Sequence, residues 1–134
     1  MYHFVCPAKY RRVVFTEDID ESLRMVCDEI SMRYEIEFIE IGTDADHVHF
    51  LIQSVPTMSP TRIIQTVKSI TAKEIFKRHP EVKKQLWGGE FWTKGYFVNT
   101  VSRQGNEKTI QAYVKSQGKE KEYKEIHSRQ LKLL

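Results

Sequence analysis

The chain has 134 residues and a formal net charge of +3, a length that suits one domain with a hydrophobic core and is too short for two ordinary ones. Its two cysteines, Cys6 and Cys27, fit neither a disulfide framework nor a zinc–thiolate site. No apolar run approaches the roughly 20 residues of a membrane span, and the N-terminal stretch is too charged for a signal peptide, so we expect a cytoplasmic protein.

The first half of the chain is predicted to contain three strands and one helix. Residues 3–15 are predicted to be extended, with Pro7 indicating an edge, a bulge or an irregular end. From Asp18, apolar residues recur at helical spacing among acidic ones, which predicts an amphipathic helix. Residues 35–42 and 47–55 are rich in β-forming residues and flank the turn-forming stretch GTDAD, which predicts a hairpin with a longer loop.

The second half is predicted to contain a helix, a strand and a terminal helix. Ser59 followed by Pro60 is a typical helix start, and apolar residues then repeat on one face until Pro80 ends the helix. The glycine pair in LWGGEFW breaks the chain, and residues 96–101 are predicted to form the last strand. Asn106 and Gly118 are suitable caps for a terminal helix.

This βαββαβ order predicts an α+β fold, a ferredoxin-like antiparallel sheet with two helices on one face and an additional C-terminal helix. The first and third strands are central in that topology. We expect residues 1–134 to form a single domain, in which residues from about 119 to 134 are a basic tail that can be flexible.

Two histidines, His47 and His49, lie two positions apart at the start of the third predicted strand. Side chains on a strand alternate faces, so both histidines should project from the same side. Two neutral imidazoles on one face can hold a divalent cation and leave positions open for substrate oxygens. Histidines in strands are also often hydrogen-bonded core or surface residues, so the pair alone leaves both interpretations open.

The predicted terminal helix carries Tyr113 and Gln117, four residues apart and therefore on one helical face. The default interpretation is a core tyrosine beside a partly exposed glutamine, although glutamine is a poor core residue. A tyrosine can also act as a covalent nucleophile, and a metal ion that polarises a phosphoryl oxygen makes phosphorus more electrophilic. Together with the histidine pair, this combination suits phosphodiester cleavage.

These residues resemble the single-tyrosine HUH transposases of small bacterial insertion sequences, the IS200-like transposase family. His47-Val48-His49 is similar to the histidine–hydrophobe–histidine motif of these enzymes, and Tyr113 with Gln117 is similar to their tyrosine helix. The stretches AKYRRVVF, DHVHFLI, SPTRIIQTVKS and LWGGEFWTKGYFVNTVS also resemble that family, so the resemblance extends over nearly the whole chain.

The resemblance implies a transposase that cleaves and rejoins single-stranded DNA at insertion-sequence ends. Tyr113 would attack a phosphate and leave a 5′-phosphotyrosine link with a free 3′-hydroxyl, which later rejoins the DNA. His47, His49 and Gln117 would hold Mg²⁺ or Mn²⁺ over the scissile phosphate. The implied partners are DNA with hairpin ends and a second copy of the chain in a homodimer, and neither a membrane nor a nucleotide cofactor is implied. The protein would be associated with the nucleoid when it is bound to DNA.

Charge is unevenly distributed, because residues 17–46 are strongly acidic and the basic residues cluster elsewhere. This pattern suggests an oriented surface for a polyanion, although solvated helix faces would produce it as well. Basic side chains on several elements are candidates for contact with the DNA backbone: Lys9, Arg11, Arg12, Arg62, Lys68, Lys73 and Lys94.

Two other functions fit the same residues. One is a domesticated HUH nuclease that processes chromosomal repeats, or a replication-initiation or relaxase-type relative. The other is a noncatalytic ferredoxin-like module that stacks bases on the aromatic residues of its central strands. Such a module would have no use for a pair of metal ligands.

Overall fold

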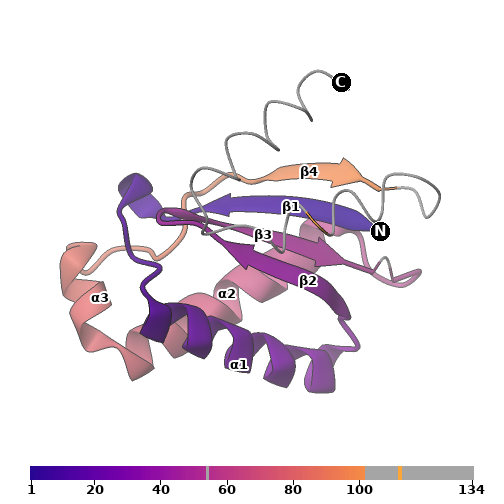
Figure 1. The fold of residues 1–134 in the computed structure, drawn as a ribbon. Helices are drawn as coiled ribbons and strands as arrows, with labels where there is room; N and C mark the ends of the chain where they lie inside the picture. The colour runs from indigo at the N-terminus through magenta and orange to yellow at the C-terminus, as the bar shows by residue number, and fades with distance from the viewer. Residues whose placement is uncertain (54, 102–111, 113–134) are drawn as a thin grey trace.

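The computed structural model describes residues 1–53, 55–101 and 112, and this part of the chain contains a four-stranded antiparallel sheet with helices against one face (Figure 1). The elements in chain order are β1 (Tyr2–Pro7), the 3-10 helix η1 (Lys9–Arg11), α1 (Glu17–Tyr34), β2 (Phe38–Thr43), β3 (His47–Ile52), α2 (Pro60–Arg78), α3 (Pro80–Gln85) and β4 (Phe97–Thr100). The predicted terminal helix, apart from Ala112, lies outside the described residues, as do Tyr113, Gln117 and the tail.

The strand order is β2-β3-β1-β4, which confirms the predicted ferredoxin-like βαββαβ sheet. β1 and β3 are the two central strands and pair antiparallel, with Pro7 opposite His47 and Val5 opposite His49. The strand that begins at His47 therefore has a hydrogen-bonded neighbour on each side, β1 and β2.

Several element boundaries differ from the predicted ones. The extended prediction for residues 3–15 is wrong after Pro7, because the chain enters η1, where Tyr10 has a φ of 59°. β2 begins at Phe38 rather than at residue 35, because Glu35 caps α1 in the left-handed conformation with a φ of 57°. A short helix, α3, was not predicted; Pro80 is at its N-terminus, a position that proline favours.

The start of α2 is as predicted. Ser59 is its N-cap, and the Ser59 Oγ accepts a hydrogen bond of 3.1 Å from the backbone N–H of Arg62. Among the described residues, no helix is both long and apolar enough to cross a membrane.

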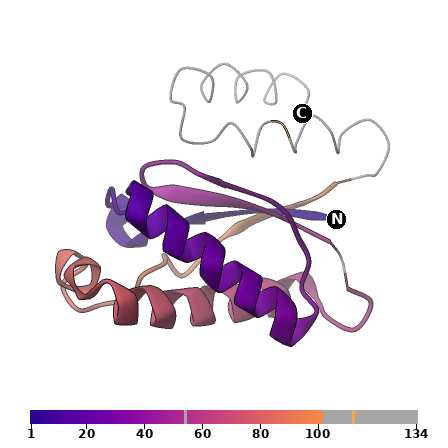
Figure 2. The ribbon, with the colours of Figure 1, turned by 60° about the horizontal axis from the view of Figure 1, so that its bottom comes forward.

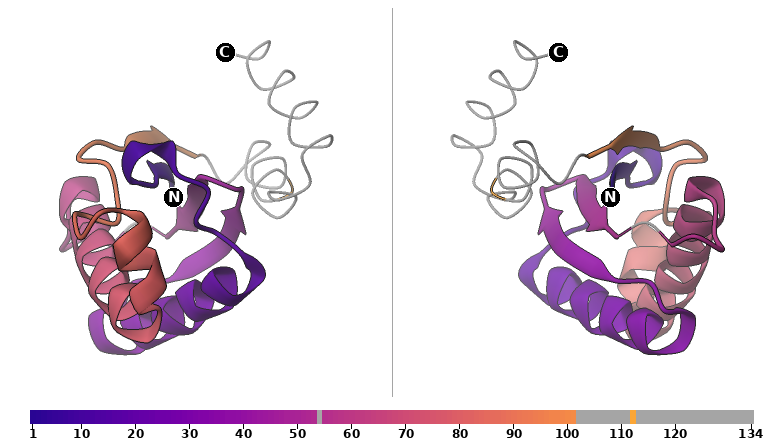
Figure 3. Two further views of the ribbon diagram at one scale, coloured as in Figure 1. Left: turned by 90° about the vertical axis from the view of Figure 1, so that its left-hand side faces the viewer. Right: turned by 90° about the vertical axis from the view of Figure 1, so that its right-hand side faces the viewer.

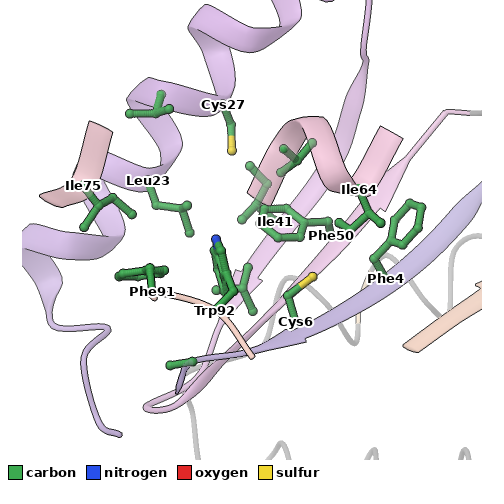
Figure 4. Close-up of a cluster of buried hydrophobic side chains, with 14 of the residues drawn as sticks. Phe4, Cys6, Leu23, Cys27, Ile41, Phe50, Ile64, Ile75, Phe91 and Trp92 are labelled. Carbon is green, nitrogen blue, oxygen red and sulfur yellow. The ribbon is translucent and has the colours of Figure 1, made fainter. Parts of the chain in front are cut away.

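The helices α1 and α2 lie on the same side of the sheet, as Figures 2 and 3 show from two directions. Alternation along β1 and β3 sends Phe4, Cys6, Val48 and Phe50 toward these helices, and we call this side the helix face. In Figure 4 Phe4, Cys6 and Phe50 point toward Leu23 and other apolar side chains of the helices. Burial of this apolar surface is the main stabilising contribution to the fold.

The opposite side of the sheet carries His3, His47, His49 and Leu51, and we call it the histidine face. All six residues of β3 are buried, so this strand is covered on both sides. Leu51 is buried there with Met1 and Val101. A strand held in this way is a rigid support for the two histidines.

One buried hydrogen bond in the core predicts a measurable loss of stability. The Trp92 indole N–H donates to the Thr71 Oγ at 3.0 Å, and both residues are buried. Thr71→Val keeps the volume but removes the acceptor, so we expect the free energy of unfolding to fall by about 1–3 kcal/mol. Urea unfolding measures this loss. Thr66→Val is the control, because the Thr66 hydroxyl is partly exposed and donates to the Arg62 carbonyl. Equal losses of stability in the two variants would contradict the role of the Trp92–Thr71 hydrogen bond.

Candidate active site

His47 and His49 lie next to each other on the histidine face, as their spacing in β3 predicts. Their ring centroids are 5.1 Å apart, and the ring planes meet at 61°. Both residues are buried, with exposed fractions of 4% and 3%. Two imidazoles are therefore fixed side by side on a central strand.

His47 is oriented by the preceding residue. Its Nδ1 lies 2.7 Å from the Asp46 Oδ1, and the other carboxylate oxygen of Asp46 accepts a hydrogen bond of 3.1 Å from the Arg11 Nε. Partial burial raises the pKa of Asp46, but the His47 hydrogen bond and the Arg11 charge outweigh this and hold it below its ordinary value. An ionised carboxylate can only accept, so Nδ1 of His47 donates its N–H to Asp46, and Nε2 is the ring nitrogen that would bind a cation.

His49 is oriented by a third histidine, His3, which the sequence analysis did not single out. The His3 Nε2 lies 2.7 Å from the His49 Nδ1, and the two rings are stacked with centroids 5.0 Å apart. Burial lowers the pKa of His3 to about 4, so His3 is neutral at pH 7 and can accept the N–H of His49. Strand alternation places His3 on the histidine face once the register between β1 and β3 is known.

The arrangement fits a divalent cation. Histidines that bind metals commonly use one ring nitrogen as the ligand, while the other donates to a carboxylate or another acceptor. Here both Nδ1 atoms have such partners, and both Nε2 atoms are buried on the histidine face. Within the described ranges no group of three or more His, Cys, Asp or Glu side chains is placed to hold a metal. The two imidazoles fit as part of a site that takes further ligands from elsewhere, such as a glutamine or the substrate.

The predicted basic residues fall into separate places. Lys9, Arg11 and Arg12 lie together at η1, where the chain leaves β1 beside His47, and Lys94 is exposed in the loop before β4. Arg62 and Lys73 are exposed on α2, in the helical layer rather than on the histidine face. The η1 group is linked to the histidine pair, because Arg11 pairs with Asp46, which in turn bonds His47.

Lys68 has a structural role that the sequence analysis did not anticipate. Its Nζ donates to the backbone carbonyls of Thr93, Lys94 and Gly95 at 2.8, 3.3 and 3.2 Å. Burial lowers the pKa of Lys68, and the Cys6 thiol and the Glu90 carboxylate partly offset this. Lys68 thus ties α2 to the loop before β4, and its contact with DNA stays a prediction.

The sequence also matches a known family over most of its length. A family model described as "Transposase IS200 like" matches residues 1–117. The chain belongs to this family. As an IS200-like transposase it is a DNA-binding enzyme that cleaves and transfers DNA. The family assignment therefore favours the transposase hypothesis over the noncatalytic module.

Named relatives of this transposase agree with the assignment. The chain is 30% identical over 116 residues to the ISDra2 transposase TnpA of Deinococcus radiodurans, and the aligned region covers 87% of this chain and 82% of that protein. It is 28% identical over 116 residues to the transposase for insertion sequence element IS200 of Salmonella typhimurium, and the aligned region covers 87% of this chain and 75% of the relative.

Solved structures are also similar to this transposase. A crystal structure from Deinococcus radiodurans, of a protein assigned as a transposase, has a TM-score of 0.70 at 27% identity and covers 87% of this chain and 89% of that one. A REP-associated tyrosine transposase bound to a REP hairpin has a TM-score of 0.59 at 10% identity, covering 84% and 62%. The second similarity shows a shared fold alone.

Proposed function

We propose that this transposase cleaves and rejoins single-stranded DNA through a 5′-phosphotyrosine intermediate at Tyr113, with residues 1–134 acting as one domain. His47, His49 and Gln117 would hold Mg²⁺ or Mn²⁺. The observation that carries the proposal is the pair of imidazoles on one face of a central strand, each with Nδ1 bonded to a neighbour. Imidazole is a softer ligand than Mg²⁺ prefers, so we expect Mn²⁺ to bind more tightly.

The proposed reaction conserves the number of phosphodiester bonds. When bound, the cation would polarise a nonbridging phosphate oxygen and stabilise charge that develops in the transition state. The Tyr113 phenolic oxygen bonds to phosphorus and releases its proton to water, while the bond from phosphorus to the 3′-oxygen of the preceding nucleotide breaks. That oxygen takes up a proton and becomes a 3′-hydroxyl. In strand transfer a 3′-hydroxyl attacks the phosphotyrosine and releases Tyr113, so no nucleotide cofactor is required.

We propose hairpin-ended DNA and a second copy of the chain as partners. The hairpin bound to the REP-associated relative supports the first, and the match of residues 1–117 to the family supports both. Within the described sheet β4 is an edge strand, and Phe97 and Val98 on it are exposed apolar side chains. An unprotected edge of this kind favours pairing with another chain.

The test of this function is the reaction itself. With Mn²⁺ or Mg²⁺, the purified chain should nick a single-stranded hairpin oligonucleotide carrying the insertion-sequence end and remain covalently attached to the 5′-phosphate of the fragment on the 3′ side of the break. Denaturing gel electrophoresis of labelled DNA measures both products. Binding without cleavage in either metal would instead support a noncatalytic module.

Asp46→Asn is expected to weaken metal binding while the fold persists. An amide accepts the His47 N–H less strongly than a carboxylate does and loses the ion pair with Arg11. We expect the Mn²⁺ concentration for half-maximal cleavage to rise by about 10- to 100-fold. The control is Asp44→Asn in the same turn, because Asp44 accepts only a local bond from the Ala45 N–H. The positioning role of Asp46 is wrong if both variants require the same Mn²⁺ concentration.

A further inference from the structure

Two aromatic side chains from distant parts of the chain meet on the surface. Tyr10 belongs to η1 and is 61% exposed, and Trp87 follows α3 and is 78% exposed. Their ring centroids are 6.1 Å apart, and the ring planes meet at 44°. We call Tyr10, Arg12 and Trp87 the aromatic patch. Large rings normally gain most by burial, so two neighbouring rings in solvent suggest a surface that is covered by a ligand.

The backbone beneath the patch adopts conformations that such residues usually avoid. Tyr10, Arg11 and Trp87 have positive φ values of 59°, 52° and 58°. Among the described non-glycine residues, only Glu35 at the end of α1 shares this property. Left-handed backbone at a bulky residue persists only where the surrounding structure holds it, and such positions are concentrated at functional sites.

Hydrogen bonds hold both segments in place. The N–H of Lys9 donates to the carbonyl of Phe91 at 2.8 Å, and the N–H of Trp87 donates to the carbonyl of Lys84 at 3.0 Å. The Gln85 side chain donates to the carbonyl of Val13 at 3.1 Å and so joins the two segments directly. The two rings are therefore presented on a braced surface rather than on independent loops.

Positive charge surrounds the rings. The Arg12 guanidinium lies 5.5 Å from the centre of the Trp87 ring, and the Lys9 ammonium lies 5.5 Å from the centre of the Tyr10 ring. Lys83 and Lys84 lie in the last turn of α3, just before Trp87. The facing acid is Glu90, which pairs with Lys9 at 3.6 Å. Aromatic faces combined with excess positive charge fit a ligand that has both flat rings and a negative backbone.

The patch is continuous with the histidine site. Arg11, next to Tyr10 in the chain, pairs with Asp46, and Asp46 in turn orients His47. The N–H of Ala8 also donates to the Asp46 carbonyl at 2.8 Å, which fixes the start of η1 at the His47 end of β3. A DNA strand that has a phosphate at the histidines and extends past this end of the sheet would therefore run toward the patch.

We propose that the aromatic patch is a stacking site for an unpaired base of single-stranded DNA, a few nucleotides from the phosphate at the histidines. This inference rests on the proposed function for the identity of the strand. Stacking accepts any base, so the patch would hold the strand without reading its sequence. Arg12 would serve both the base, by stacking, and the neighbouring phosphate, by its charge.

The first measurement is Trp87 fluorescence during titration with a short oligothymidylate, without divalent cation and at fixed salt concentration. A base stacked on Trp87 quenches its emission. The other tryptophan, Trp92, is buried and bonded to Thr71, so the Trp87→Phe variant reports the background signal. We expect saturable quenching in the unaltered chain and none in Trp87→Phe. Equal signals from the two chains would overturn the proposal.

The second measurement compares affinity for a hairpin with a single-stranded extension and for the same hairpin without it. Trp87→Ala should weaken binding of the extended hairpin by roughly 5- to 100-fold and leave the blunt hairpin unchanged, and Trp87→Phe should restore most of the loss. The matched control is Tyr34→Ala, which removes a ring that Arg33 contacts in the same way at 5.5 Å, but on the acidic helix α1.

Other outcomes have definite meanings. Equal weakening for both hairpins, or an altered oligomeric state of Trp87→Ala, would overturn the stacking site; the latter would assign the patch to a protein interface. Adduct formation by the unaltered chain with metal tests the proposed function separately. A chain that shows Trp87-dependent quenching but no adduct would therefore refute cleavage and retain the stacking site.

Discussion

Replacing Tyr113 by phenylalanine is expected to abolish the covalent protein–DNA adduct while hairpin binding stays largely intact. Phenylalanine keeps the ring but lacks the oxygen that bonds to phosphorus, so no phosphotyrosine can form. Adduct formation is measured on denaturing gels with DNA labelled on the 3′ side of the break, since that fragment carries the 5′-phosphate. Affinity for the uncleaved hairpin is measured in parallel, because it separates loss of chemistry from loss of binding.

A neighbouring tyrosine provides the control for this substitution. Tyr123 lies ten residues further along the chain and has a phenol of the same intrinsic reactivity. Tyr123→Phe should form the adduct at the rate of the unaltered chain. An adduct that persists in Tyr113→Phe, or disappears in Tyr123→Phe, would show that the nucleophile has been assigned to the wrong residue.

His47→Ala and His49→Ala are expected to slow cleavage by about 10²–10³-fold at a fixed Mn²⁺ concentration, because each removes one of two imidazole ligands. Single-turnover cleavage as a function of Mn²⁺ concentration measures the effect, and direct Mn²⁺ binding by calorimetry provides a readout that does not depend on activity. Affinity for DNA without metal should change much less, because phosphate contacts elsewhere supply most of it.

The control for these variants is a histidine in the helical layer. His79 lies between α2 and α3, and its Nε2 is 2.7 Å from the Ser22 Oγ. His79→Gln can keep this bond and should leave the Mn²⁺ dependence unchanged. Because His47 and His49 are buried, unfolding by urea is compared for all three variants. Equal losses of cleavage and DNA affinity, or of cleavage and stability, would assign the histidines a structural role instead.

Much of the fold could be predicted because local rules determine it. Helical spacing of Ile19, Leu23, Val26 and Ile30 located α1, and the Ser59 cap located the start of α2. The order of elements then allowed few sheet topologies, so the central position of β3 followed without any knowledge of contacts. The side-by-side placement of His47 and His49 needed only the alternation of a strand.

The parts that were missed depend on contacts between distant residues. His3 joins His49 through the register of β1 against β3, which a single sequence does not specify. Lys68 turns toward three carbonyls of the loop before β4, although its charge suggested a surface role. The meeting of Tyr10 with Trp87 likewise requires the folded chain.

The helix face and the histidine face of the sheet also differ in the substitutions that they tolerate. Its helix face is filled with large apolar side chains that maintain the fold, whereas the imidazoles and the carboxylate that would perform the chemistry lie on or beside the other face. Substitutions on the histidine face outside the buried cluster of Met1, Leu51 and Val101 can therefore change the proposed site without disturbing the packing of the helix face.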